Sequence, residues 1–206
     1  DFRGNLSFKD VSFAYKDDNY VLNNLNIEIK ENQTVAFVGH TGSGKSTIMN
    51  LIVKFYDVSK GTLEINGKNI NEYSREYLRE KTAIVLQDSF LFDGTLLENI
   101  TPNGNRRTAK EALEKVGGDF ILKTRPLDSK VEIGGSNFST GEKQLICLAR
   151  ALAKNPKILI LDESTANIDS ETEQSVGYAI EKLKQGRTTL IIAHRLSTIK
   201  NADNIV

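Results

Sequence analysis

The stretch Gly39-His40-Thr41-Gly42-Ser43-Gly44-Lys45-Ser46-Thr47 decides the fold of this 206-residue chain. It matches the pattern G-x-x-x-x-G-K-[ST], which is typical of a phosphate-binding loop. The apolar run 34–38 before it suits a buried strand, and residues 48–53 after it have helical spacing. Because strand, glycine loop and helix N-terminus follow in this order, the chain is expected to bind a nucleoside triphosphate. The alternative is a glycine-rich turn without a ligand.

Each part of the loop has an expected role. Its glycines allow backbone N–H groups to converge on phosphate oxygens at the positive end of a helix. Lys45 is expected to reach the β- and γ-phosphates, and the Ser46 hydroxyl to bind Mg²⁺. The residues assigned to the nucleotide are Gly39, Thr41, Gly42, Ser43, Gly44, Lys45, Ser46 and Thr47.

Composition narrows the class of protein. The chain is long enough for one sizeable domain, and Lys+Arg and Asp+Glu are both 27, so no basic footprint for nucleic acid is expected. The single cysteine, Cys147, excludes an internal disulfide and is expected in the core. No apolar run has the length of a membrane span, and no signal peptide is visible. The chain stops inside a strand-like segment, so we expect an excised domain truncated at its C-terminus.

The apolar pattern predicts an α/β fold. Residues 6–30 alternate apolar and polar, which favours antiparallel strands joined by a turn at Asp17-Asp18-Asn19, and residues 61–67 form another strand with an Asn-Gly turn. Continuous apolar runs and helical patterns then follow one another, which indicates a parallel sheet buried on both faces. The runs are 83–86, 158–161 and 189–192, and the helical patterns are 74–80, 108–116, 139–154 and 170–184.

The expected architecture is a single domain over residues 1–206. It has a P-loop NTPase parallel-sheet core and an N-terminal antiparallel β subdomain, over about 1–88 and 155–206. Residues 89–154 lack strand patterns and are expected to form an inserted helical subdomain.

Polar residues follow three of the predicted strands. Asp162 and Glu163 end the run 158–161; we expect Asp162 to hold Mg²⁺ and Glu163 to activate water for attack on the γ-phosphate. His194 is placed to sense the γ-phosphate, and Gln87 to ligate Mg²⁺ or position water. The alternatives are an exposed acidic turn for the carboxylates and a structural role for the histidine.

Tyr15 lies upstream on a predicted strand. Its ring is expected to stack on a purine base, the alternative being an aromatic of the core or rim.

The remaining segments carry a family resemblance. Residues 137–144, Asn-Phe-Ser-Thr-Gly-Glu-Lys-Gln, resemble the Leu-Ser-Gly-Gly-Gln signature of ATP-binding cassette (ABC) proteins. The order of phosphate loop, Gln87, signature, Asp162-Glu163, a D-loop at 164–169 and His194 also matches that family. Residues 55–57, 88–92 and 193–198 look like its exporter branch.

The resemblance implies ATP as ligand, Mg²⁺ as cofactor and ATP hydrolysis as activity. It makes Tyr15 the base-stacking aromatic, and it assigns Ser139 and Gly141 to the γ-phosphate of an ATP bound by a second cassette. The implied partners are that second nucleotide-binding domain and a transmembrane domain, at the cytoplasmic face of a membrane, with no nucleic acid. The alternatives are a translation or DNA-repair type of ABC ATPase and a regulatory nucleotide-binding module with little hydrolysis.

The chain departs from the family at two places. In the signature, Thr140 replaces a glycine and Glu142 places a carboxylate near the triphosphate, where repulsion is expected. We therefore expect a heterodimer, whose partner supplies an intact signature, with a homodimer as the alternative. Upstream, Ile133 stands where exporters usually carry a glutamate that contacts the membrane domain, and the acid is Glu132 instead.

Overall fold

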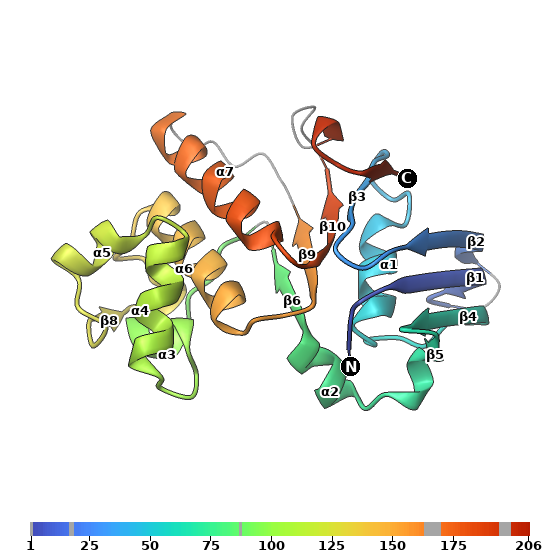
Figure 1. The fold of residues 1–206 in the computed structure, drawn as a ribbon, viewed down its shortest axis with the longest axis horizontal. Coiled ribbons are helices and arrows are strands. Elements are labelled where there is room, and N and C mark those ends of the chain that lie inside the picture. Colours follow the sequence, from blue (N-terminus) through green and yellow to red (C-terminus); the bar gives the residue numbers. More distant parts are fainter. Residues whose placement is uncertain (1, 17–18, 87, 163–169, 194–198) are drawn as a thin grey trace. The chain divides into compact units, whose positions relative to one another are not determined.

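A computed structural model describes residues 2–16, 19–86, 88–162, 170–193 and 199–206 (Figure 1). They fall into two compact units. The first contains Asp1–Ala83, Lys157–Ser164 and Gly186–Val206, and the second contains Ile84–Pro156 and Thr165–Gln185. The second unit therefore takes in a helix that lies beyond the expected helical segment 89–154.

The first unit contains an antiparallel sheet, as the alternating pattern predicts. Its strands are in the order β2 (Tyr20–Ile29), β1 (Leu6–Ala14), β4 (Lys60–Ile65) and β5 (Lys68–Asn69). Leu6 faces Ile29 on one neighbouring strand and Ile65 on the other, and all three side chains are buried. Asp17 and Asp18, expected in the turn between β1 and β2, lie outside the described residues.

A second sheet carries the phosphate loop, and the chain order of its strands differs from their spatial order. The strands are β11 (Asn204–Ile205), β3 (Thr34–Phe37), β10 (Thr188–Ile192), β9 (Ile158–Asp162) and β6 (Thr82–Val85). The pairs β11–β3, β3–β10 and β10–β9 are parallel. This arrangement confirms the predicted α/β class.

The outer strand β6 differs from expectation. The runs in β9 and β10 are buried as predicted, but Ile84 is partly exposed, and Leu86 lies past the end of β6 with 62% of its surface exposed. The expectation of burial holds for Ala83 but is wrong for residues 84–86, because β6 lies at the edge of the sheet.

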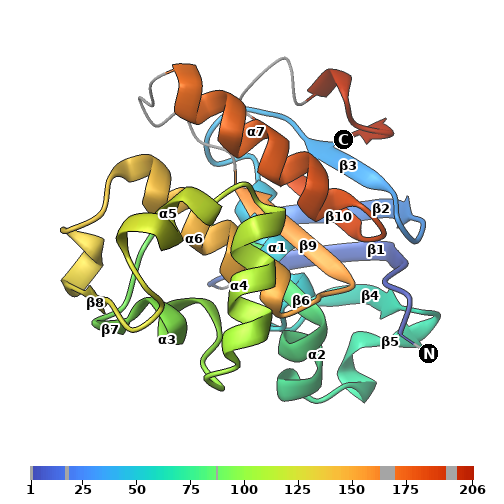
Figure 2. The ribbon, with the colours of Figure 1, turned by 60° about the vertical axis from the view of Figure 1, so that its left-hand side comes forward.

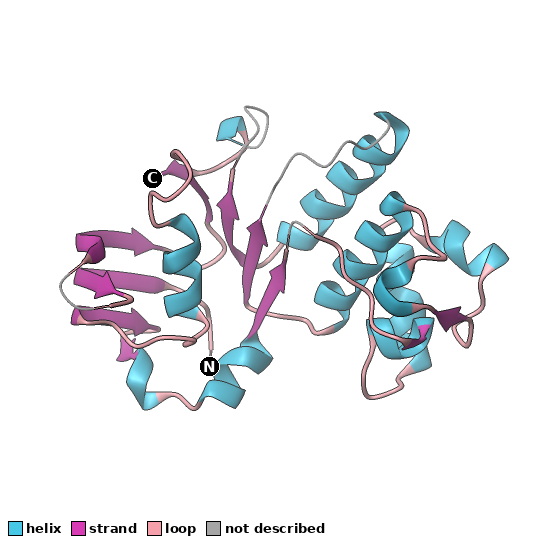
Figure 3. Ribbon diagram, turned by 180° about the vertical axis from the view of Figure 1, so that it is seen from behind, coloured by secondary structure: helices cyan, strands magenta, loops and turns pink. Residues whose placement is uncertain are grey.

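Helix α1 (Lys45–Ile52) lies between these two sheets (Figures 1 and 3). Ile48, Leu51 and Ile52 repeat at helical spacing and pack into the main hydrophobic core with side chains of both sheets. Burying each such side chain contributes about 1.5–3 kcal/mol. The packing fixes the direction of α1, and thus where its N-terminus points. The 3₁₀ turn η1 (Ile70–Glu72) and helix α2 (Arg75–Lys81), capped by Ser74, complete this part of the chain.

The second unit is mainly helical (Figure 2). Helix α6 (Thr140–Ala153) contacts α3 (Leu96–Ile100), α4 (Arg106–Lys115) and α7 (Ser170–Lys184). Helix α5 (Asp119–Thr124) and the 3₁₀ turn η2 (Ile133–Gly135) complete the set. The unit also contains a small antiparallel pair that was not expected from the sequence, β7 (Gly94–Thr95) and β8 (Lys130–Val131). Two-residue strands are too short to leave a periodic pattern.

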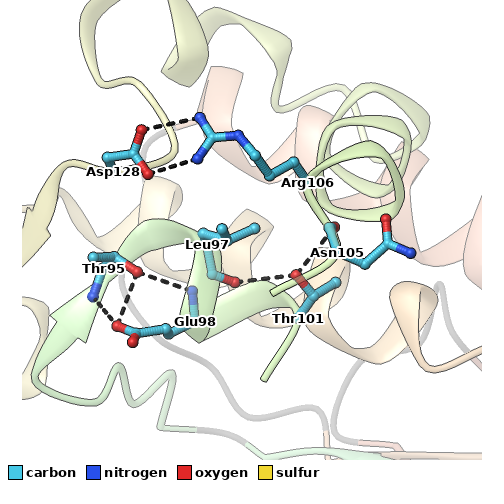
Figure 4. Close-up of polar contacts among 7 residues, drawn as sticks. All are labelled: Thr95, Leu97, Glu98, Thr101, Asn105, Arg106 and Asp128. Carbon is cyan, nitrogen blue, oxygen red and sulfur yellow. Dashed lines mark hydrogen bonds and ion pairs between the residues drawn. The ribbon is translucent and has the colours of Figure 1, made fainter. Parts of the chain in front are cut away.

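Local hydrogen bonds fix the helix ends of the second unit (Figure 4). Thr95 and Glu98 form a capping box: Glu98 N donates to Thr95 Oγ1 over 3.1 Å, and Thr95 N donates to Glu98 Oε2 over 2.7 Å. Arg106 makes a two-pronged ion pair with Asp128, at 2.6 and 2.9 Å. Because both side chains of that pair are exposed, it adds little stability.

The segment 90–92 is tied to α6 by hydrogen bonds around the buried Asn99. Arg150 donates to Asn99 O over 2.5 Å and to Phe90 O over 3.2 Å, and Phe92 N donates to Asn99 Oδ1 over 2.8 Å. Burial lowers the pKa of Arg150 from its usual value. Cys147, expected in the core, is only half-buried, and its Sγ lies 3.6 Å from Phe90 O.

Candidate nucleotide-binding site

The strand register brings the phosphate loop and Asp162 to the same edge of the parallel sheet. Phe37 on β3 pairs with Ile192 on β10, and Ile192 pairs with Asp162 on β9. These three residues therefore form one row across neighbouring strands. Since neighbouring strands lie about 4.8 Å apart, the ends of β3 and β9 are about 10 Å apart. The loop that leaves β3 and the carboxylate that ends β9 can thus face one bound nucleotide.

Lys45 is held inside the loop by the loop's own oxygens. Its Nζ donates to Gly39 O over 2.7 Å, to His40 O over 2.9 Å and to Ser43 Oγ over 3.2 Å. The side chain is 9% exposed, so the ammonium group has exchanged most of its water for these three acceptors. The loop thereby presents a preformed cation to any anion that enters, as expected for a phosphate site.

The start of α1 is built for an external ligand. Gly44 precedes the helix with φ 93°, no side chain caps the first turn, and no acidic residue lies in it. The first-turn N–H groups therefore lack the side-chain partner that most helices provide. A Cβ on Gly44 would approach Leu22 Cδ2 to 2.7 Å, so packing as well as φ requires glycine here.

Tyr15 is anchored to the helix that follows the loop. Its Oη lies 3.1 Å from Thr47 Oγ1 and accepts from Asn50 Nδ2 over 3.3 Å, while its ring meets Phe13 and Tyr56 edge-on. The side chain is 46% exposed, which leaves surface for a base. Asn50 and Tyr56 were not predicted as neighbours of Tyr15. Asn50 follows Thr47 by three positions, so helical spacing could have found it once Tyr15 was placed.

Two of the residues expected to hold Mg²⁺, Ser46 and Asp162, lie within the described part of the chain. Ser46 is exposed in the first turn of α1, and Asp162 is half-buried at the end of β9. No cluster of three or more His, Cys, Asp or Glu side chains occurs within the described part of the chain. Mg²⁺ usually takes only one or two protein oxygens and completes its octahedron with phosphates and water, so this donor set fits it. Gln87, Glu163, His194 and the segment 164–169 lie outside the described residues.

The signature segment forms the start of α6. Ser139 is the N-cap: its Oγ accepts from Glu142 N over 3.2 Å, and its N donates to Glu142 Oε2 over 2.8 Å. Ser139 and Thr140 are exposed, whereas Gly141 is buried. The Glu142 carboxylate, expected to repel the triphosphate, is engaged in this capping box and lies 3.9 Å from Arg125 Nε.

The second departure from the family pattern is Ile133, with the acid Glu132 one position earlier. The neighbouring acid, Glu132, is exposed, and its Oε2 accepts from Ser136 Oγ over 2.7 Å within its own loop. Ile133 is 77% exposed. This position therefore presents an apolar side chain to its surroundings.

The fold and the loop define a nucleotide-binding domain of the phosphate-loop class. The family model described as "ABC transporter" matches residues 22–166. The chain is 50% identical over 208 residues to the "Probable multidrug resistance ABC transporter ATP-binding/permease protein YheH" of Bacillus subtilis (strain 168), covering 98% of this chain and 31% of that protein. It is 43% identical over 211 residues to the "ATP-dependent lipid A-core flippase" of Pasteurella multocida (strain Pm70), covering 99% and 36%.

A solved structure agrees with these relatives. The "Structure of a bacterial Atm1-family ABC exporter with ATP bound" matches with a TM-score of 0.88 and 37% identity, over 99% of this chain and 36% of that one. The chain belongs to the ABC transporter family and corresponds to the ATPase domain of its exporters. It spans about a third of the length of these relatives. The translation, DNA-repair and regulatory alternatives receive no support.

Proposed function

We propose that this chain binds and hydrolyses ATP to drive transport by a larger exporter. The observation that carries the proposal is the Lys45 ammonium group, held by Gly39 O and His40 O at the uncapped start of α1. An anion with several oxygens can replace those carbonyls and accept from the first-turn N–H groups at the same time. The likeness to an exporter solved with ATP bound supports the triphosphate of ATP as that anion.

Mg²⁺ would be held by Ser46 and Asp162, together with phosphate oxygens. When bound, it would neutralise the charge that builds on the β- and γ-phosphates during transfer. Gln87 would complete this group or position water, Glu163 would take the proton of the attacking water, and His194 would hydrogen-bond the γ-phosphate. Tyr15, oriented by Thr47 and Asn50, would offer its ring to the adenine.

ATP hydrolysis by this domain can be tested directly on the full-length protein. Phosphate release should require Mg²⁺, stop after chelation by EDTA, and fall by roughly 10²-fold in Asp162→Asn, which loses the carboxylate but keeps the shape. Arg107→Ala, which removes an exposed arginine from α4, should not change the rate. Hydrolysis that survives chelation and Asp162→Asn would refute the assigned roles.

We propose a second nucleotide-binding domain as partner, in a heterodimer. Support comes from Thr140, which is exposed at the start of α6 where the family has a glycine. In a homodimer, two such threonines would oppose the approach of phosphate to Ser139 and Gly141. Thr140→Gly, alone and with Phe138→Leu and Glu142→Gln, should increase ATP-dependent self-association. If the unmodified chain already associates with itself as strongly in the presence of ATP, the heterodimer proposal is refuted.

We also propose a transmembrane domain as partner, at the cytoplasmic face of a membrane. Support comes from the relative described as an ATP-binding/permease protein, of which this chain covers 31%. Within the described part of the chain, no helix has the length and apolar character of a membrane span. The second unit exposes Phe90, Phe92 and Ile133, and Gly134 N donates to Leu91 O, so the two loops adjoin. This apolar surface is suited to docking such a domain. Ile133→Lys, which places a cation in this apolar surface, should lower transport-coupled ATPase activity while leaving ATP binding unchanged.

A further inference from the structure

Arg125 joins three parts of the signature segment. It follows helix α5, and its Nη2 donates to Asn137 O over 2.6 Å. Its Cζ lies 4.4 Å from the centre of the Phe138 ring, and its Nε lies 3.9 Å from Glu142 Oε1. A planar guanidinium group can stack on an aromatic ring and still donate from its edge, which a lysine cannot do in the same way. One cation therefore holds a carbonyl, a ring and a carboxylate together.

The Glu142 carboxylate requires a neutralising cation if a phosphate is to approach Ser139. Its side chain is 17% exposed, and its carboxylate is fixed beside Ser139 by the capping box. The negative charge suits the start of α6, because it faces the positive end of the helix dipole. The same charge would repel the phosphates of an ATP that approaches Ser139. Among the described residues, Arg125 alone forms an ion pair with Glu142.

The cap leaves phosphate donors at the start of α6. Ser139 Oγ accepts from Glu142 N, so the hydrogen of the Ser139 hydroxyl group can be donated outward. The N–H groups of Thr140 and Gly141, in the first turn, also lie at the positive end of the helix. These donors lie on the same side as the cap, close to Glu142. How well an anion can use them therefore depends on the net charge of that cap.

We infer that Arg125 is a positioning residue of this signature: it neutralises Glu142 and holds its carboxylate in the cap, so that Ser139 can donate to the phosphate of ATP. The inference rests on the proposed function. It explains why Phe138 and Glu142 occur together, since the ring carries the guanidinium group and the carboxylate requires it. The steric effect of Thr140 is separate and is not relieved by Arg125.

The test compares four forms of the full-length protein in its native assembly: wild type, Arg125→Ala, Glu142→Gln, and the double variant. Arg125→Ala should raise the KM for ATP about tenfold, because an unneutralised carboxylate then faces the triphosphate. Glu142→Gln should stay within about twofold of wild type, since glutamine can still fill the N3 position of the cap. The double variant should return to within about threefold of wild type.

Rescue of Arg125→Ala by Glu142→Gln distinguishes charge neutralisation by Arg125 from a purely structural role. If Arg125 serves only to hold Asn137 O, the double variant will be as impaired as Arg125→Ala, and the inference is overturned. It is equally overturned if Arg125→Ala behaves as wild type. The defect of Arg125→Ala should also shrink as KCl is raised from about 0.1 M to 1 M, because salt screens the repulsion. Arg125→Lys keeps the charge but loses the stacking on Phe138, so its KM should lie between those of wild type and Arg125→Ala.

A second measurement, thermal unfolding with and without MgATP, distinguishes failure of this inference from failure of the proposed hydrolysis. The rise in melting temperature on adding MgATP reports binding without turnover. If wild type shows that rise but no hydrolysis, the proposed activity fails while the four-way comparison still applies to binding. In that comparison the rise should be smaller in Arg125→Ala and restored in the double variant. Arg107→Ala, which breaks an exposed ion pair with Glu111, is the matched arginine control and should behave as wild type.

Discussion

Replacing Lys45 by alanine should weaken ATP binding without unfolding the chain. In the free loop the Lys45 ammonium group donates to Gly39 O, His40 O and Ser43 Oγ. ATP would replace neutral acceptors with anionic phosphate oxygens, so the number of hydrogen bonds changes little and the gain is mainly Coulombic. That attraction is about 1 kcal/mol at 4 Å in water and about 4 kcal/mol at a dielectric constant of 20.

Because the loop lies at the surface, an intermediate value of about 2–3 kcal/mol applies. The dissociation constant for MgATP should therefore rise roughly 30- to 150-fold in Lys45→Ala. The free energy of unfolding should change by less than about 1 kcal/mol, because the loop residues around Gly42 are exposed and water can reach the freed carbonyls. Isothermal titration calorimetry and urea unfolding of the same samples give both numbers.

Lys54 provides a matched control. Its Nζ also donates to two backbone carbonyls, Tyr73 O over 2.9 Å and Ile70 O over 3.3 Å, but it lies in the segment after α1 and not in the phosphate loop. Lys54→Ala should lower stability by about 1–3 kcal/mol and leave the dissociation constant within about twofold of wild type. If the two variants weaken ATP binding equally, the loss reflects stability, and the phosphate role of Lys45 is refuted.

Three other substitutions test the loop, the chemistry and a helix cap. Gly44→Ala should lower the melting temperature and ATP affinity together, because φ 93° disfavours alanine by about 1–2 kcal/mol and its Cβ would approach Leu22 to 2.7 Å; unchanged melting would contradict this. Glu163→Gln should retain ATP binding while hydrolysis falls by roughly 10²-fold or more, and a wild-type rate would exclude Glu163 as the base. Hydrogen bonds from Thr95 hold the pKa of Glu98 below its usual value. The cap therefore stabilises the fold at neutral pH and loses that contribution as the pH falls through the folded-state pKa of Glu98. Thr95→Ala should raise that pKa, as NMR titration of the Glu98 carboxyl group would show.

The features predicted from sequence were those encoded within a short stretch. The phosphate loop at 39–47 needs only local spacing, and the runs in β9 and β10 are long enough to show that they are buried. The position of β6 at the sheet edge could not be predicted, because edge or centre depends on strand order and not on the strand itself. The strands β7 and β8 are too short to leave any pattern.

The signature segment likewise contains one contact that could be predicted from the sequence and one that could not. Ser139 and Glu142 have the spacing of a capping box, so their mutual hydrogen bonds could have been predicted from the sequence. The family pattern alone predicts that the Glu142 carboxylate lies near the triphosphate and repels it. Its ion pair could not have been predicted, because Arg125 lies 17 positions away and meets it only through the packing of the loop after α5.

The two helix N-termini assigned to phosphate, those of α1 and α6, differ in their capping and charge. Helix α1 begins at a glycine with no side-chain cap and has the Lys45 ammonium group beside it, so its donors are available before any ligand arrives. Helix α6 begins with its own carboxylate in the cap, neutralised by Arg125. An anion therefore gains more at α1 than at α6. The phosphate loop alone should set most of the affinity for ATP, and the start of α6 should contribute only when an ATP held elsewhere is brought against it.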